Sequence, residues 1–163
     1  MSTDHTSFSD EERAHLEISL PSAQELCRLG LATMIDIRQT FEIKMKGAIP
    51  ETEHIPLFEV KRLLGQALSD DEQDILDAGQ PKDIDVMSFF TTINQLHHGR
   101  DHLLLFICNS GRRSLTAASL LRAMGYPKAL SVAGGFQAWK KLQQAATPAT
   151  PTSPPAGDGQ SRP

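Results

Sequence analysis

Cysteine is scarce in this chain: the sequence of 163 residues contains two, Cys27 and Cys108. Cys27 lies in a polar helical pattern, whereas Cys108 ends a short apolar run, so their surroundings are unrelated. Two cysteines in a chain of this length exclude a small fold held together by disulfides. A reducing, cytoplasmic setting therefore fits best.

Long hydrophobic runs are also missing. The longest purely apolar run covers residues 103–107, which is far too short to span a bilayer. Residues 1–17, MSTDHTSFSDEERAHLE, are polar and acidic and lack the basic and apolar regions of a signal peptide. We therefore expect a cytoplasmic protein that has no membrane partner.

The chain has no excess of basic residues. Its formal net charge is -4, which gives no support for a nucleic-acid partner. Its 39% hydrophobic and 22% charged residues are ordinary for a globular protein, and its length suits one domain with a real core.

The two ends differ in composition from the middle. Residues 1–16 are polar without a clear period, and we expect them to be flexible. Residues 147–163, TPATPTSPPAGDGQSRP, hold no large apolar side chain and are expected to be disordered, because they cannot bury enough surface to offset their ordering entropy. The folded domain should therefore cover residues 17–146.

Short apolar runs alternate with amphipathic stretches inside these limits. We predict buried strands over residues 31–37, 103–107 and 130–132. We predict helices over residues 21–29, 57–68, 70–78, 86–96, 114–124 and 136–142. Ser22 is placed to cap the first of them. This alternation is typical of an α/β domain with a mostly parallel sheet, whose reactive groups lie beyond the carboxyl ends of the strands.

The most informative segment is LLLFICNSGRRSLTAASLLRAM, at residues 103–124. A buried strand ends on Cys108, a short loop follows, and a helix starts near Ser114. The backbone N–H groups of such a loop, together with the helix N-terminus, form a concave anion site that stabilises a thiolate. Cysteine alone is often an inert core residue, but this combination favours Cys108 as the catalytic nucleophile. The predicted substrate-binding residues are Asn109, Ser110, Gly111, Arg112, Arg113 and Ser114.

Residues 108–114 resemble the active-site loop of the rhodanese family, Cys-x-x-Gly-x-Arg-Ser. Two further stretches are similar to that family in the same order: Ile35-Asp36-Ile37-Arg38 upstream, and VAGGFQAW at residues 132–139 downstream. The resemblance covers about residues 18–142. It implies a rhodanese-like α/β fold with a mostly parallel central sheet flanked by helices. We expect Asp36 and Arg38 to form a structural pair that braces the loop from a strand end.

The resemblance also implies an activity, that of a thiosulfate sulfurtransferase. Cys108 would take the outer sulfur of thiosulfate or of another persulfide donor and pass it to a thiol or cyanide acceptor. Arg112 and Arg113 would attract the charge of the donor. No metal and no organic cofactor is needed.

Two alternatives to this interpretation remain. In the first, the chain is a relay or binding module that accepts sulfur only from a dedicated protein donor, docked on the long region over residues 60–100. In the second, it is a phosphatase. Phosphatases of the tyrosine type place five residues between cysteine and arginine, whereas four separate Cys108 from Arg113. The smaller loop suits a sulfur atom better than a phosphoryl group.

A few other residues could carry chemistry but are more simply structural. Cys27 could resolve a persulfide, yet its helical pattern favours a packed residue. His97 and His98 are adjacent and lack a cluster of further ligands, which argues against a metal site. Trp139 is expected to anchor the core, and His54 is a weak candidate for the wall of the pocket.

Overall fold

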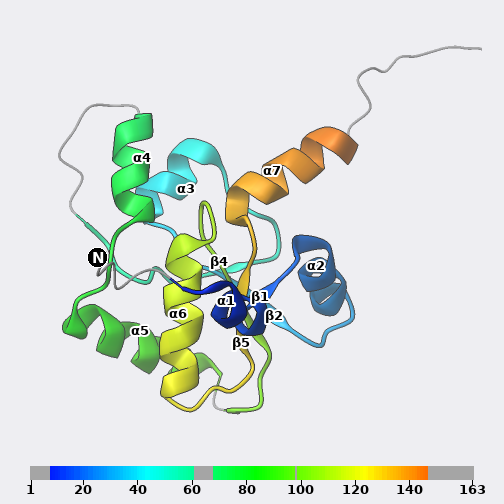
Figure 1. Cartoon of the computed structure of the whole chain (residues 1–163), viewed down its shortest axis with the longest axis vertical. Coiled ribbons are helices and arrows are strands. Elements are labelled where there is room, and N and C mark those ends of the chain that lie inside the picture. Colours follow the sequence, from blue (N-terminus) through cyan, green and yellow to red (C-terminus); the bar gives the residue numbers. More distant parts are fainter. Residues whose placement is uncertain (1–7, 61–67, 98, 147–163) are drawn as a thin grey trace, which may run out of the picture.

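A parallel five-stranded sheet organises the protein, which we describe from a computed structural model covering residues 8–60, 68–97 and 99–146 (Figure 1). The strands follow the order β1-β5-β4-β2-β3. Their bounds are β1 Glu17–Ile18, β2 Thr33–Asp36, β3 Glu53–His54, β4 Leu104–Ile107 and β5 Ala129–Val132. Every neighbouring pair is parallel. The predicted α/β fold class with a mostly parallel sheet is therefore confirmed.

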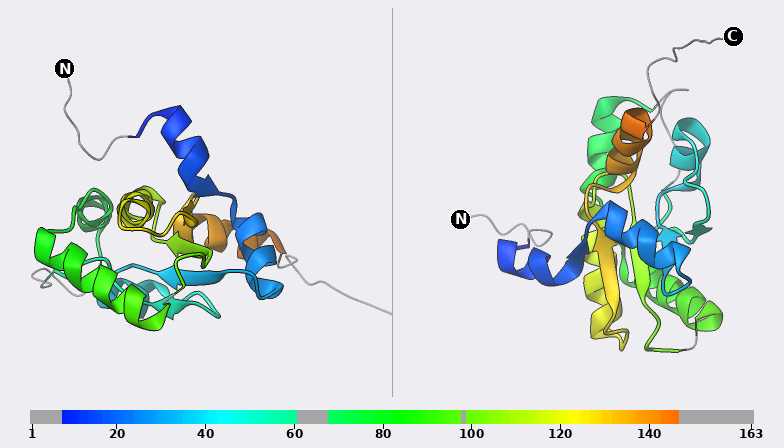
Figure 2. Two further views of the ribbon diagram at one scale, coloured as in Figure 1. Left: turned by 90° about the horizontal axis from the view of Figure 1, so that it is seen from below. Right: turned by 90° about the vertical axis from the view of Figure 1, so that its right-hand side faces the viewer.

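Helices cover both faces of this sheet. Their bounds are α1 Asp10–Leu16, α2 Leu20–Arg28, α3 Thr40–Lys46, α4 Asp70–Asp77, α5 Asp83–Leu96, α6 Arg112–Ala123 and α7 Gly135–Ala146. Seen from below, α5 and α6 lie on one side of the sheet, and α2 and α7 lie on the other (Figure 2). No helix in these described ranges is long and apolar enough to cross a bilayer.

The central strand β4 is buried along its whole length. Its side chains alternate between two apolar clusters, because successive residues of a strand point to opposite faces. Leu104 and Phe106 belong to the cluster beneath α5 and α6, and so does Cys108, which follows the strand. Leu105 and Ile107 belong to the cluster beneath α2 and α7.

The register of the strands brings two functional candidates, Asp36 and Cys108, to the carboxyl end of the sheet. Asp36 pairs with Ile107, and Phe106 pairs with Ser131. Cys108, which follows Ile107, therefore lies at the carboxyl end of the sheet beside the ends of β2 and β5. The loop after β4 rises there toward α3, α4 and α7 (Figure 1).

Several local expectations need correction. Residues 10–16, for which no helix was predicted, form α1, which begins with a capping box between Ser9 and Glu12. The cap of α2 is Ser19, whose side chain accepts from the Ser22 N–H. Residues 57–60 and 68 are not helical. The remainder of that expected helix, over residues 61–67, and the tail over residues 147–163 lie outside the described residues.

Candidate active site

Cys108 stands directly after β4, and Gly111 turns the chain into α6. Gly111 has a φ of 99°, in the left-handed region that favours glycine. A side chain there would also meet the backbone nitrogen of Gly134 at 3.1 Å. The sequence places a glycine at this position because no other residue gives the turn without strain.

The sulfur of Cys108 lies inside the curl of the loop. It accepts hydrogen bonds from the backbone N–H groups of Gly111, at 3.2 Å, and Ser114, at 3.4 Å. The Ser114 hydroxyl lies 3.4 Å from the sulfur and 2.7 Å from the hydroxyl of Ser131. Two fixed backbone donors and a rotatable hydroxyl suit an anionic sulfur. Ser131 can satisfy Ser114 when the Ser114 hydroxyl turns toward that sulfur.

Arg113 points away from this curl into a buried charge cluster. Its Nη1 and Nη2 donate to the two carboxylate oxygens of Glu42 at 2.8 and 2.7 Å, and Nη2 also donates to Asp77 at 3.1 Å. All three side chains are buried or nearly so. Two carboxylates thus face the Arg113 guanidinium and neutralise its positive charge inside the protein. Arg113 is placed to hold the loop, whereas Arg112, at the start of α6, is exposed.

The charge cluster changes the proton affinity of its members. Burial alone would raise the pKa of Glu42, but hydrogen bonds and the charge of Arg113 outweigh it and hold that pKa below its usual range. Burial alone would lower the pKa of Arg113, and Glu42 reverses this, so that the pKa is raised. Both groups are therefore charged at neutral pH.

Helix α4 contributes two side chains to this cluster. Asp77 accepts from the Asn109 side-chain amide at 3.0 Å, which ties the loop residue next to Cys108 to α4. Gln73, one turn earlier, donates to both Glu42 and Asp77 at 2.9 Å. Neither Gln73 nor Asp77 was expected at the site from the sequence. Their spacing of four residues, on the buried side of a helix with Leu76, is the signal that could have found them.

Asp36 and Arg38 form the expected pair. Arg38 donates from Nε at 3.0 Å and from Nη2 at 2.8 Å to the Asp36 carboxylate, and both residues are buried. The guanidinium lies 4.4 Å from the centre of the Phe136 ring, and the Phe136 N–H donates to the Cys108 carbonyl oxygen at 2.7 Å. The pair therefore reaches the Cys108 backbone through Phe136.

The structure brings Gly111 and Ser114 to the Cys108 sulfur but leaves that sulfur covered. Cys108 and Asn109 have no exposed surface, and Ser110 is half-buried. The side-chain oxygens of Ser110 and Asn109 are buried without a partner in the described part of the chain. These unpartnered polar atoms beside Cys108 are available to a bound group.

Comparisons with known proteins agree with this arrangement. The family model "Rhodanese-like domain" matches residues 19–142. The chain is 30% identical over 122 residues to the human "Thiosulfate:glutathione sulfurtransferase", covering 75% of this chain and 90% of that protein. It is 31% identical over 106 residues to the mouse "Thiosulfate sulfurtransferase/rhodanese-like domain-containing protein 3", covering 65% of this chain and 56% of that protein. The chain belongs to the rhodanese-like domain family.

A solved structure of this fold carries a different description. A Rhodopseudomonas palustris protein of unknown function, described as a possible tyrosine phosphatase, is similar to this chain with a TM-score of 0.52 and 23% identity. The similarity covers 82% of this chain and 86% of that one. At this identity it shows the fold alone.

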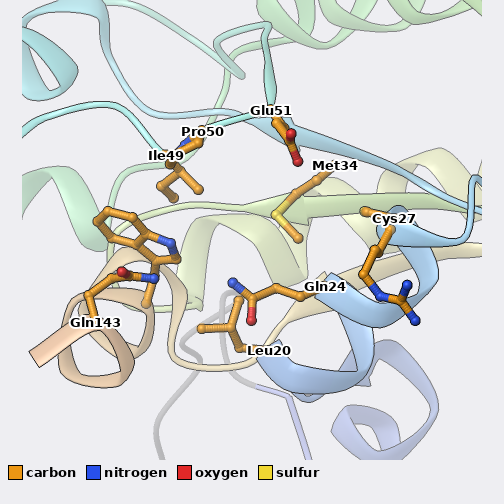
Figure 3. A pocket seen from close by; sticks show the side chains of 10 residues that line it. Leu20, Gln24, Cys27, Met34, Ile49, Pro50, Glu51 and Gln143 are labelled. Carbon is orange, nitrogen blue, oxygen red and sulfur yellow. The ribbon is translucent and has the colours of Figure 1, made fainter. Parts of the chain in front are cut away.

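The second cysteine of this rhodanese-like domain lies in a separate cavity of about 300 Å³ between α2 and α7 (Figure 3). Leu20, Met34 and Trp139 line that cavity together with Cys27. Burial, and then the charge of Glu51, raise the pKa of the Cys27 thiol. The cavity is on the α2 side of the sheet, whereas Cys108 packs on the α6 side.

The histidines weighed in the sequence have structural contacts. His97 lies 2.9 Å from a carboxylate oxygen of Glu53, and its ring is 5.2 Å from that of His102. His54 lies 2.8 Å from the carbonyl oxygen of Arg38. His98 is outside the described residues. Among the described residues, no group of three or more His, Cys, Asp or Glu side chains could hold a metal ion.

Proposed function

We propose that this rhodanese-like domain is a sulfurtransferase that carries sulfur as a persulfide on Cys108. The observation that supports this most directly is the position of the Cys108 sulfur, within 3.4 Å of the backbone N–H groups of Gly111 and Ser114. Such donors stabilise the thiolate that attacks and the terminal sulfur that results.

The first half-reaction loads the protein. The Cys108 thiolate attacks the outer sulfur of thiosulfate, a sulfur–sulfur bond forms, and the bond to the sulfite sulfur breaks. Sulfite leaves with that electron pair, and the negative charge stays on the new terminal sulfur of Cys108. No proton, metal or organic cofactor enters this balance.

The second half-reaction unloads the protein. A thiolate or cyanide ion attacks the terminal sulfur, and the bond between the two sulfurs of Cys108 breaks. The Cys108 thiolate is restored, and the acceptor leaves as a persulfide or as thiocyanate.

The loop residues have different roles in this scheme. We propose that Asn109, Ser110, Gly111 and Ser114 surround the reacting sulfur and hold the anionic donor. Arg112 supplies an exposed positive charge at the entrance. Arg113 positions the loop, since Glu42 and Asp77 occupy its guanidinium.

The relay alternative has one observation in its favour, the full burial of Cys108. A donor reaches that sulfur only after side chains or the loop above it move. A protein donor that binds and opens the loop would restrict loading to that partner. Free thiosulfate would then fail as a donor.

Steady-state turnover with thiosulfate and cyanide, followed as sulfite and thiocyanate, tests the proposal. We expect turnover in wild type and in Cys27→Ser, and none in Cys108→Ser. Turnover that survives in Cys108→Ser rejects the persulfide mechanism. If wild type is inactive with thiosulfate but is loaded by a persulfidated protein donor, the relay alternative holds. Hydrolysis of an aryl phosphate that is lost in Cys108→Ser would instead support a phosphatase.

A further inference from the structure

One carboxylate, that of Asp77 at the end of α4, holds both ends of the loop that follows Cys108. Its Oδ1 accepts from Arg113 Nη2 at 3.1 Å and from Gln73 Nε2 at 2.9 Å. Its Oδ2 accepts from the side-chain amide of Asn109 at 3.0 Å. Asn109 is the first residue of the loop, and Arg113 lies in the first turn of α6. A residue outside the cysteine motif therefore fixes both flanks of the segment that encloses the reacting sulfur.

Asp77 is a second negative charge on a guanidinium that already has one. Glu42 alone occupies both Nη1 and Nη2 of Arg113, at 2.8 and 2.7 Å. Asp77 accepts from three N–H donors, as a carboxylate does. Among the described residues, Arg113 is the one cation that pairs with either carboxylate. The buried cluster therefore combines one positive charge with two negative charges.

The charge of this cluster acts on the reacting sulfur. Burial lowers the pKa of Arg113, whereas Glu42, followed by the negative charges of Cys108 and Asp77, raises it. The guanidinium and the Cys108 thiolate therefore attract each other through the protein interior, where charges are screened less than in water. The Nε of Arg113 is buried without a partner in the described part of the chain, so the carboxylates leave one donor unused. Asp77 opposes the pull of Arg113 on any anion at the loop.

We propose that Asp77 is a positioning residue that also sets the charge of the sulfur donor that the site favours. It holds Asn109 and Arg113 in place, and its charge weakens the attraction that Arg113 exerts on an anionic donor. Thiosulfate is doubly charged and bears the largest penalty, whereas a singly charged or neutral donor bears less. This inference rests on the proposed function and names the charge class of the donor for the same site.

Asp77→Asn removes the charge and can keep the hydrogen bonds. The oxygen of the new side chain faces Arg113 and Gln73, and its NH2 group faces Asn109. The Asn109 side-chain oxygen is buried without a partner among the described residues, and it accepts from that NH2 group once the Asn109 amide turns over. The matched control is Asp74→Asn, which changes the net charge equally at an exposed position of the same helix.

Alkylation of Cys108 by iodoacetate, an anion, and by neutral iodoacetamide tests the charge without any sulfur transfer. All proteins carry Cys27→Ser, so that Cys108 is the one thiol. Both reagents react with the same thiolate, and the ratio of their rates therefore reports the charge that the incoming reagent meets. We expect Asp77→Asn to raise the ratio of iodoacetate to iodoacetamide by about fivefold, and Asp74→Asn to leave it near the wild-type value. Asp77→Ala, which removes the hydrogen bonds together with the charge, should also raise the ratio.

Steady-state turnover with cyanide and two donors gives a second readout. Thiosulfate is doubly charged, and methanethiosulfonate offers the same kind of outer sulfur with a single charge. We expect Asp77→Asn to lower the KM for thiosulfate by about fivefold and to change kcat less, because the charge acts on donor binding. The KM for methanethiosulfonate should fall by a smaller factor.

Three results would overturn the inference. The first is a ratio of alkylation rates that stays at the wild-type value in both Asp77 variants, or rises equally in Asp74→Asn. The second is a change of both alkylation rates by the same factor, which a purely structural role of Asp77 would give. The third is a KM for thiosulfate that does not fall. Failure of wild type to load Cys108 with sulfur would instead reject the proposed function, while the alkylation ratio would still test the charge of Asp77.

Discussion

The charge cluster around Arg113 shows how single residues hold the loop. Arg113 comes from the loop itself, Glu42 from α3 and Asp77 from α4, and all are removed from solvent. Breaking a buried ion pair leaves an uncompensated charge, which costs far more than losing a pair at the surface. The cluster is therefore expected to contribute to the stability of the whole domain.

Glu42→Gln tests that expectation. It keeps the side-chain volume but leaves Arg113 with one carboxylate, and we expect a loss of about 3–5 kcal/mol in the free energy of unfolding. Urea denaturation at neutral pH measures it. The matched control is Glu25→Gln, because the pair of Glu25 with Arg28 has side chains that are 55% and 67% exposed. Equal losses in the two variants would contradict the role of the cluster.

The contribution of Glu42 should also depend on pH. Folding lowers the pKa of the Glu42 carboxylate, so this group stabilises the protein fully at pH values above its unfolded pKa of about 4.3. That stabilisation is lost as the pH falls through the folded pKa. We expect the stability gap between wild type and Glu42→Gln to be constant above about pH 5 and to shrink below about pH 4. Urea curves over this range measure the gap. A gap that persists undiminished to about pH 3 would contradict the lowered pKa.

The turn that precedes α7 helps to fix the position of Cys108. Gly134 and Gly135 have φ values of 76° and 55°, and the N–H groups just after them hold the carbonyl oxygens of Cys108 and Asn109. A side chain at Gly135 would clash with those two backbones. The tight approach requires glycine, which explains the Gly-Gly step before this helix.

Gly135→Ala is expected to disturb the loop as well as the turn. The matched control is Gly30→Ala, which has a φ of 76° but no atom within 4 Å of the added side chain. We expect Gly30→Ala to cost about 1–2 kcal/mol from backbone strain alone, and Gly135→Ala to cost more and to slow the alkylation of Cys108. Thermal unfolding and timed alkylation measure the two effects. Equal effects would show that the contact is unimportant.

Most helices and strands near the site could be predicted from the sequence, because local sequence patterns determine them. The strand β4 is a continuous apolar run, β2 lies in the mainly apolar stretch over residues 31–37, and α4 carries a capping box between Ser69 and Glu72. By contrast, α1 escaped prediction because Leu16 is its one buried residue. Residues 57–60 look helical by pattern but are not helical in the structure. The Gln39 side chain bonds the Phe58 carbonyl oxygen and the Val60 N–H, a tertiary contact that no local pattern contains.

The candidate site was predictable only in part for the same reason. The motif identified Cys108, Gly111 and Ser114, which lie within one loop. The partners of Arg113 lie 71 and 36 residues earlier in the chain. The role of Arg113 in holding the loop could therefore be found only from the folded structure.

At the scale of the whole molecule, the sheet separates the two cysteines. Cys27 packs against the cluster beneath α2 and α7, whereas Cys108 belongs to the cluster beneath α5 and α6. The raised pKa of the Cys27 thiol also leaves little thiolate at neutral pH. We expect Cys27→Ser to leave sulfur loading unchanged and oxidation of wild type to give no bond between the cysteines. Peptide mass mapping after mild oxidation checks this. A Cys27–Cys108 disulfide in the monomer would contradict the separation.

The intact mass of the protein after incubation with thiosulfate is the most direct test for a persulfide on Cys108. We expect a gain of one sulfur atom in wild type, lost again on adding cyanide or a thiol, and no gain in Cys108→Ser. A wild-type protein that gains no sulfur from thiosulfate or from a persulfide donor, and whose Cys108 also resists alkylation, would contradict it. Cys108 would then be an inert core residue.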